Sequence, residues 1–349
     1  MPENARSAGV LPCLDCSLFR LPGEIVILIA MPLEEKSLIQ SIRKAARAER
    51  RSIRIGIGDD CAVLRPPRGH EVVVTTDFTL EGIHFRRAWH SPEVVGRRCL
   101  TRGLSDIAAM GGKPLAVFLS LALPGKLLQK WVDDFMRGLM DLARECDVPL
   151  AGGDTAQSPQ GILADIVVLG TVPNGTAVLR SGAKSGDRIY VTGELGGGSA
   201  ALKEFFAGRR PRPGDFSRHF HPVPRLAVGE FLRRRGIATS MIDLSDGLST
   251  DLSHICEESG VGAEIAADDI PRARVGRERK PVDLGLALNG GEDYELLFTA
   301  PADKRVPTSI AGVRVTAIGH VMRSKRIILR KSTGASEPLN PQGWEHFRR

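Results

Sequence analysis

The stretch V-V-V-T-T-D at residues 72–77 places three apolar β-branched residues directly before two hydroxyls and a carboxylate. Such a run predicts a buried strand whose end carries oxygen atoms. The same order of apolar residues and then an acid recurs in P-L-A-G-G-D-T at residues 149–155 and in M-I-D-L-S-D-G at residues 241–247. Because ligands gather at strand ends in α/β folds, these acids are candidates for a binding site.

Further acids lie in G-I-G-D-D at residues 56–60 and in L-S-D at residues 104–106. Two carboxylates about 4 Å apart repel by roughly 4 kcal/mol at an effective dielectric constant of about 20, so a converging set requires a cation. Oxygen ligands without His or Cys favour Mg²⁺, which in turn points to phosphate chemistry. Each acid alone could also be a turn residue, a helix cap or a helix-surface residue, and these alternatives stay open.

The composition, 42% hydrophobic residues in a chain of 349, is that of a globular protein long enough for two domains. No apolar run approaches the roughly 20 residues that a membrane helix needs. The net charge of +7 includes basic runs at residues 43–54, 209–212, 233–235 and 272–280. Because aromatic residues make up only 5% of the chain and do not interleave with these runs, solvated surface is favoured over nucleic-acid binding.

The cysteines and the first residues bear on localisation and chain start. Six cysteines are scattered, with a single C-x-x-C at residues 13–16, which favours reduced thiols in a cytoplasmic protein over a zinc site. Residues 1–30 lack both clear periodicity and the pattern of a signal peptide. We expect them to be a disordered extension or the product of a start codon assigned too far upstream.

Strand and helix patterns interleave along the chain, which predicts mixed α/β layers. Strands are expected at residues 71–76, 115–123, 162–171, 188–192, 294–299, 313–319 and 327–330. Helices are expected at residues 33–48, 92–110, 128–146, 198–207, 224–235, 248–259 and 282–288. A turn-rich connector at residues 172–186 divides the chain into halves of 31–173 and 174–349.

Two glycine-rich segments complete the series of motifs. T-G-E-L-G-G-G at residues 192–198 opens a helix, where backbone amides and the helix dipole favour anions, although it matches neither a Walker A nor a dinucleotide motif. N-G-G-E-D-Y-E-L at residues 289–296 sets two acids before a strand. His84 lies in an acid-rich segment and is either structural or part of a ligand site.

In this order the motifs resemble the thiamine-monophosphate kinase family, within the superfamily of aminoimidazole ribonucleotide synthetase. The resemblance rests on seven segments, which are G-I-G-D-D-C-A, T-T-D-x-x-x-E-G-I-H-F, L-S-D-I-A-A-M-G, G-G-D-T, L-R-S-G-A-K-S-G-D, I-D-L-S-D-G-L-x-x-D-L and G-G-E-D-Y-E-L. It extends from about residue 33 to residue 347. The segment around His84 and G-G-E-D-Y-E-L point to this member of the superfamily.

The resemblance implies a two-domain α/β (α+β) fold. The N-terminal domain, residues 31–173, would bind ATP and magnesium and pair its sheet in a homodimer, and residues 174–349 would complete the site. The implied activity is transfer of the ATP γ-phosphoryl group to thiamine monophosphate. Several Mg²⁺ ions would be held by Asp60, Thr75, Thr76, Asp77, Asp106, Asp154, Asp243 and Asp246. ATP would contact Gly153, Asp154, Arg180 and Ser245, thiamine would contact His84, Glu292 and Trp344, and Asp77, Asp106 and Arg180 would be catalytic.

Two departures from the family pattern concern the site. Residues 97–104 read R-R-C-L-T-R-G-L where relatives more often show K-A-L-A-V-N-L, so Gly103 replaces an asparagine, and Gly197-Gly198 stand where an acid is common. A sister activity on the same fold, using ATP to activate a carbonyl or a selenide, is one alternative. A non-catalytic nucleotide- or nucleic-acid-binding protein is the other.

Overall fold

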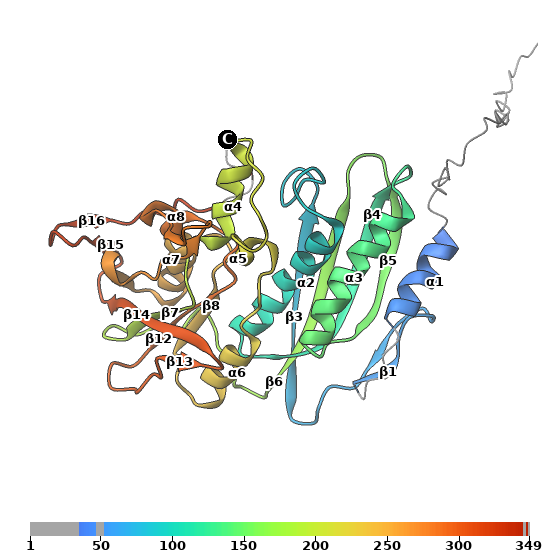
Figure 1. Ribbon diagram of the computed structural model, residues 1–349. Coiled ribbons are helices and arrows are strands. Elements are labelled where there is room, and N and C mark those ends of the chain that lie inside the picture. Colours follow the sequence, from blue (N-terminus) through green and yellow to red (C-terminus); the bar gives the residue numbers. More distant parts are fainter. Residues whose placement is uncertain (1–34, 47–51, 345–346, 348–349) are drawn as a thin grey trace, which may run out of the picture. The chain divides into compact units, whose positions relative to one another are not determined.

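The computed structural model describes residues 35–46, 52–344 and 347. The expected extension at residues 1–30 and both ends of the helix expected at 33–48 lie outside the described residues. The described residues belong to one compact unit, which contains two large sheets with helices packed on them and two further strand pairs, β1-β2 and β10-β11 (Figure 1).

The first sheet has four strands in the order β3-β6-β4-β5. β3 pairs antiparallel with β6 and β6 with β4, whereas β4 and β5 are parallel. The elements of this part of the chain are α1 (Glu35–Ala45), β1 (Ile53–Ile55), β2 (Val63–Leu64), β3 (His70–Leu80), α2 (Pro92–Ala109), β4 (Lys113–Pro124), α3 (Gln129–Glu145), β5 (Leu150–Ser158) and β6 (Leu163–Pro173).

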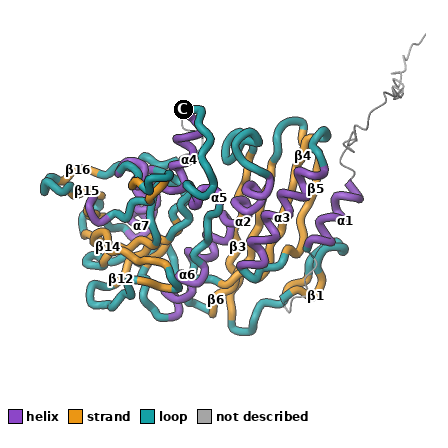
Figure 2. Tube along the Cα trace, viewed as in Figure 1, coloured by secondary structure: helices purple, strands orange, loops and turns teal. Residues whose placement is uncertain are grey.

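The two faces of this sheet have different surroundings. α2 and α3 run along one face (Figure 2), where Leu119 and Ile166 are fully buried in the core that the helices cover. Side chains alternate between the faces of a strand, so their neighbours point the other way. On that other face Val72, Val74 and Phe78 of β3 are 44%, 61% and 51% exposed. A row of large apolar side chains thus lies open along the edge strand.

The second sheet has the strand order β16-β15-β9-β14-β7-β12-β8, with β13 paired to β14. Adjacent strands of this sheet are antiparallel, except that β15 and β9 are parallel. A core of buried aliphatic side chains lies between this sheet and α7. Its elements are β7 (Arg188–Thr192), α4 (Gly197–Phe206), α5 (Ser217–Phe220), α6 (Leu226–Arg234), β8 (Ser240–Asp243), α7 (Leu248–Ser259), β9 (Gly262–Ala266), α8 (Leu284–Asn289), β12 (Leu296–Ala300), β13 (Ser309–Ile310), β14 (Val313–Met322), β15 (Ile327–Arg330) and β16 (Ser336–Pro338). A short 3-10 helix, Ala267–Asp269, and the pair β10 (Arg274–Val275) and β11 (Lys280–Pro281) lie beside it.

Helix α2 contacts both sheets. Along most of its length it packs on β3 and β6, and its last turn, with Ala108 and Ala109, joins a core that includes Val228 and Leu232 of α6 and Met241 of β8. Residues near the C-terminal end of α2 are therefore placed where the two halves of the chain meet.

The expectation of mixed α/β layers is confirmed. The strands expected at 188–192 and 327–330 and the helix expected at 248–259 coincide with β7, β15 and α7. β5 and β8 had been indicated only as short runs before an acid, and β9 was not expected. The sequence of β9, G-A-E-I-A, is too short and too poor in β-branched residues to stand out from its surroundings.

Candidate functional site

Three of the predicted acids converge at the junction of the two halves. Asp77 lies on β3, Asp106 lies near the end of α2, and Asp243 ends β8. The Thr75 hydroxyl donates a hydrogen bond to Asp106 Oδ2, and Ser105 Oγ donates one to Asp243 Oδ2 at 2.7 Å. Since Thr75 and Asp77 are two residues apart on a strand, both side chains face α2.

The pKa values of these three carboxyls are all raised, because the nearby positive charge does not offset their burial and mutual repulsion. Burial raises the pKa of Asp77, with Arg102 opposing and Asp106 adding to the shift. Burial also raises the pKa of Asp106, against the hydrogen bond from Thr75. For Asp243, burial and then the neighbouring Asp106 raise the pKa to about 7. All three shifts disfavour the ionised form, which a bound cation would favour.

A second set of predicted ligands lies on the opposite, open face of the first sheet. The Thr76 hydroxyl donates to Asp165 Oδ1 at 3.3 Å, and in the sheet register Asp165 is followed by Ser120 and then Asp154. Neighbouring strands are about 4.8 Å apart, so Asp154 lies about 10 Å from Asp165 across the sheet. The predicted ligands of Mg²⁺ therefore do not form one cluster, because strand alternation separates Thr76 from Thr75 and Asp77.

Two further predicted residues, Asp60 and Gly153, lie in the loop after β1 and on the edge strand β5. Asp60 is exposed in the loop after β1, where its N–H binds Asp59 Oδ1 at 3.0 Å. Gly153 has φ of 151°, and a Cβ added there would lie 1.8 Å from the Leu119 carbonyl oxygen. The close pairing of β5 with β4 thus requires a glycine at residue 153, whatever ligand it contacts.

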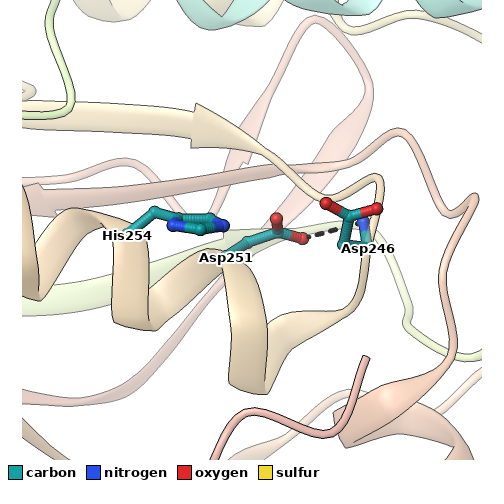
Figure 3. Close-up of side chains that lie close together, drawn as sticks. All are labelled: Asp246, Asp251 and His254. Atoms are coloured by element: carbon teal, nitrogen blue, oxygen red, sulfur yellow. Dashed lines mark hydrogen bonds between the residues drawn. The ribbon is translucent and has the colours of Figure 1, made fainter. Parts of the chain in front are cut away.

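The loop after β8 carries Ser245 and Asp246 at the start of α7. The N–H groups of Asp246 and Gly247 both donate to Asp251 Oδ2, at 3.2 and 3.0 Å. Figure 3 shows Asp251 and His254 directed from α7 toward Asp246, and one ligand atom of each of the three lies within 4.8 Å of the others. Asp251 therefore orients the loop that presents Asp246.

Arg180 lies in the connector between the two sheets and is exposed. Its positive charge lowers the pKa of both Asp106 and Asp243, against the larger effect of burial. The backbone at Arg180 is held by Ser259, whose hydroxyl donates to the Arg180 carbonyl oxygen at 3.1 Å. The side chain is thus near the buried carboxylates and open to solvent, as a phosphate-binding arginine would be.

A cavity of about 690 Å³ lies beside the carboxylates, within the usual size range of small-molecule sites. His84, Glu292 and Trp344, the residues predicted for thiamine, all line it together with Ser245 and Asp246. His84 Nδ1 accepts the N–H of Leu80 at 2.9 Å, which fixes the ring, and the Trp344 side chain is 52% exposed. Other lining residues are the aromatic Trp89 and Phe206.

Glu292 is held by two arginines of α2. Arg98 Nη2 contacts Glu292 Oε2 at 2.6 Å and Arg102 Nη2 contacts Glu292 Oε1 at 2.8 Å. Burial alone would raise the pKa of Glu292, but Arg98 and Arg102 outweigh it and lower the pKa to about 2. The backbone of Glu292 has φ of 66°, an unfavourable value for a non-glycine residue. Its N–H donates to the Ser245 carbonyl oxygen at 2.8 Å.

The start of α4, expected to attract anions, already has a carboxylate of this chain. Asp293 accepts hydrogen bonds from the N–H groups of Gly196 at 2.6 Å and Gly198 at 2.9 Å. Burial raises the pKa of Asp293 to about 7, with these hydrogen bonds opposing the shift. The glycine-rich loop is therefore closed by the G-G-E-D segment instead of being open to phosphate.

Gly103, one departure from the family pattern, has a steric explanation. A Cβ at residue 103 would lie 2.5 Å from Val168 Cγ2 of β6. α2 thus packs more closely on the sheet than a side chain at this position would allow.

Arg98 and Arg102 are the site residues that the sequence reasoning missed. They precede Asp106 at spacings of eight and four residues, so all three lie on one face of α2. Charged residues repeated at that spacing in an otherwise buried helix were a signal that could have been read.

The residues present fit a hard divalent cation. Thr75, Asp77, Asp106 and Asp243 offer only oxygen, and the raised pKa values of the three acids show that positive charge at this place would be favourable. Among the described residues, no helix is both long enough and apolar enough to span a membrane.

Comparisons with known proteins show the family to which the chain belongs. Residues 58–172 match the family described as AIR synthase related protein, N-terminal domain, and residues 184–332 match its C-terminal domain. The chain is 38% identical to thiamine-monophosphate kinase of Escherichia coli (strain K12) over 328 residues, which cover 91% of this chain and 99% of the relative.

Solved structures give the same result. The crystal structure of thiamine-monophosphate kinase from Stenotrophomonas maltophilia K279a is 36% identical, with a TM-score of 0.75, and the match covers 86% of this chain and 97% of that one. AaThiL complexed with AMPPCP and TMP is 29% identical, with a TM-score of 0.71, and the match covers 90% of this chain and 97% of that one.

Proposed function

Since this chain belongs to the thiamine-monophosphate kinase family, we propose that it transfers the γ-phosphoryl group of ATP to thiamine monophosphate. The bond between the γ-phosphorus and the β,γ-bridging oxygen breaks, and a bond forms between that phosphorus and an oxygen of the acceptor phosphate. The products are ADP and thiamine diphosphate. The observation that carries this proposal is the position of the cluster of Asp77, Asp106 and Asp243 beside the cavity lined by His84, Glu292 and Trp344, which Asp77 also lines.

We assign Mg²⁺ to two groups of residues. Thr75, Asp77, Asp106, Asp243 and Asp246 would hold it at the junction of the two halves. Asp60, Thr76 and Asp154, which lie outside this cluster, would contribute further ligands. Bound Mg²⁺ would neutralise the charge of the phosphates.

The chain's own residues bind and orient the two substrates. Arg180, beside the buried carboxylates, would contact the transferred phosphates, and Gly153 and Ser245 would contact ATP. His84 and Trp344 would bind the thiamine rings, and the anionic Glu292 would face their positive charge. No side chain has to remove a proton, because the acceptor oxygen is already anionic at neutral pH. Catalysis then comes from positioning and charge stabilisation.

We further propose the domain organisation and assembly. Residues 31–173 would bind ATP and Mg²⁺ and residues 174–349 would complete the site. Val72, Val74 and Phe78 on the open face of β3 form a row of exposed apolar side chains, which supports pairing of two such sheets in a homodimer. The free thiols at Cys61, Cys99, Cys146 and Cys256 support a cytoplasmic location.

The decisive assay combines purified protein, ATP, Mg²⁺ and thiamine monophosphate, with thiamine diphosphate measured by chromatography. Formation of thiamine diphosphate in proportion to enzyme is the expected result. Absence of product at every Mg²⁺ concentration would overturn the proposal. A steep decrease of DNA affinity with salt, in a protein without ATP turnover, would support a nucleic-acid-binding function instead.

A further inference from the structure

Arg102 lies between the two parts of the proposed site. Its Nη2 contacts Glu292 Oε1 at 2.8 Å, on the side of the cavity, and its Nη1 contacts Asp77 Oδ1 at 3.4 Å, on the side of the carboxylates. Arg102 also lines the cavity itself. Asp106 follows one turn later on the same face of α2, about 6 Å along the helix axis.

The charges around Arg102 are unbalanced. Arg98 and Arg102 share the single carboxylate of Glu292, so these three side chains carry one excess positive charge. The Asp77 contact is long for a charge-assisted hydrogen bond, which is usually 2.7–2.9 Å. If Asp77 holds a cation, the excess charge of the two arginines is directed toward the cavity.

Arg98 and Arg102 differ in what else they bind. The Arg98 side chain is only 4% exposed, and it also donates to the His219 carbonyl oxygen at 2.8 Å. Arg98 is therefore enclosed by protein groups. Arg102 is 12% exposed, and its two contacts use only two of the five N–H groups of a guanidinium. Within the described residues, Arg102 thus retains donors for a ligand in the cavity.

On the basis of the function proposed above, we infer that Arg102 binds the phosphate of thiamine monophosphate and selects the phosphorylated over the unphosphorylated vitamin. The phosphate takes the place of the long Asp77 contact while the hydrogen bond to Glu292 is kept. Thiamine extends from there toward Trp344, and the acceptor oxygen faces the carboxylates of Asp77 and Asp106. A planar guanidinium is well matched to two phosphate oxygens.

The test measures the dissociation constants of thiamine and thiamine monophosphate by calorimetry, in the wild type and in Arg102→Met. A charge-assisted contact corresponds to a factor of about ten to one hundred in affinity. We expect Arg102→Met to weaken thiamine monophosphate by that factor and thiamine by less than about threefold. The KM for thiamine monophosphate should rise in parallel, with the KM for ATP unchanged.

Two further variants control for folding and for charge. Arg97→Met removes another arginine of α2, one that pairs with Glu145 instead, and should leave both affinities unchanged. Arg102→Lys keeps the positive charge but not the planar guanidinium, so it should lose part of the preference for thiamine monophosphate over thiamine. This variant serves as the test if Arg102→Met does not fold.

Three results would overturn the role of Arg102. They are an equal loss of affinity for both ligands, which indicates a structural ion pair, an unchanged affinity for thiamine monophosphate, and a wild type that binds both ligands equally. If the wild type forms thiamine diphosphate in any of these cases, the proposed function still stands. A wild type that forms no product contradicts the proposed function itself.

Discussion

Replacing Asp243 by asparagine should make the protein more stable and inactive at the same time. Asp243 is buried, and burial together with Asp106 raises its pKa from the ordinary 3.8 to about 7. That difference corresponds to about 4 kcal/mol of stability lost when the carboxyl ionises in the folded protein. Asparagine has the same shape, carries no charge and can still accept the hydrogen bond of Ser105.

The expected gain is smaller than the full electrostatic cost. A buried amide group with incomplete hydrogen bonding costs about 1–3 kcal/mol, so the net gain at pH 7.5 without divalent cations should be about 1–3 kcal/mol. For a chain of this size that is a rise in Tm of about 1–4 °C. With Mg²⁺ and ATP present the order should reverse, because only the wild type gains stability from bound cation.

The pH dependence of stability tests the same electrostatic effect of Asp243 independently. Between pH 3.8 and about 7 the unfolded chain has lost the Asp243 proton while the folded chain retains it, so wild-type stability decreases as pH rises through this window. The difference in unfolding free energy between Asp243→Asn and wild type should therefore increase over the same window. Urea unfolding in EDTA at several pH values measures it.

The control is Asp269→Asn, a change of an exposed acid in the short 3-10 helix, which should alter neither stability nor turnover. A variant at Asp243 that is less stable than wild type in EDTA would refute the electrostatic reasoning. A variant that is still stabilised by Mg²⁺ and ATP as much as the wild type would remove Asp243 from the cation site.

Three other predictions address the chemistry, the pH dependence and the assembly. Asp77→Asn should abolish turnover and leave the circular dichroism spectrum unchanged, and a normal rate would exclude Asp77 from cation binding. His90 and His219 contact each other through their Nε2 atoms at 2.9 Å, and burial followed by Arg98 lowers their pKa values to about 4 and about 3. Below pH 6.5 these two histidines are protonated in the unfolded chain but stay neutral in the folded protein. Each histidine should therefore reduce the free energy of unfolding by up to about 1.4 kcal/mol per pH unit as the pH falls from 6.5 toward 4. The variant with both histidines changed to glutamine should show a flatter profile in urea unfolding, and an unchanged slope would contradict the assignment. Val74→Lys on the open face of β3 should shift the mass in light scattering from dimer to monomer, and a dimeric variant would place the interface elsewhere.

The parts of the site that were predictable are those in which local sequence determines position. An apolar run that ends in T-T-D predicts a strand with oxygen atoms at one end, and β3 has this form. Asp251, which had no assigned role, binds backbone N–H groups at the start of its own helix α7, as aspartates commonly do. Even the separation of Thr75 from Thr76 could have been read, since adjacent strand residues face opposite ways.

The ion pairs of Glu292 could not be read from the sequence in this way. Arg102 and Glu292 are 190 positions apart, and no local pattern indicates which acid of the second half meets which arginine of the first. The hydrogen bonds from Gly196 and Gly198 at the start of α4 to Asp293 are equally non-local. In both cases the partner is set by how α2 and the G-G-E-D segment pack together, which depends on the whole core.

The spacing of charged residues along α2 indicates how the acceptor would be oriented. Arg98, Arg102 and Asp106 follow one another at intervals of four residues, so they form a line along one face of the helix. Arg98 and Arg102 pair with Glu292, which lines the cavity, whereas Asp106 accepts the hydrogen bond of Thr75. An elongated substrate with a cationic ring at one end and a phosphate at the other would match this line, with its ring near Glu292 and its phosphate toward Asp106. The opposite orientation would remove the phosphate from Arg102 and place the cationic ring beside the cations that the carboxylates would hold, where two like charges about 4 Å apart repel by roughly 4 kcal/mol at an effective dielectric constant of about 20.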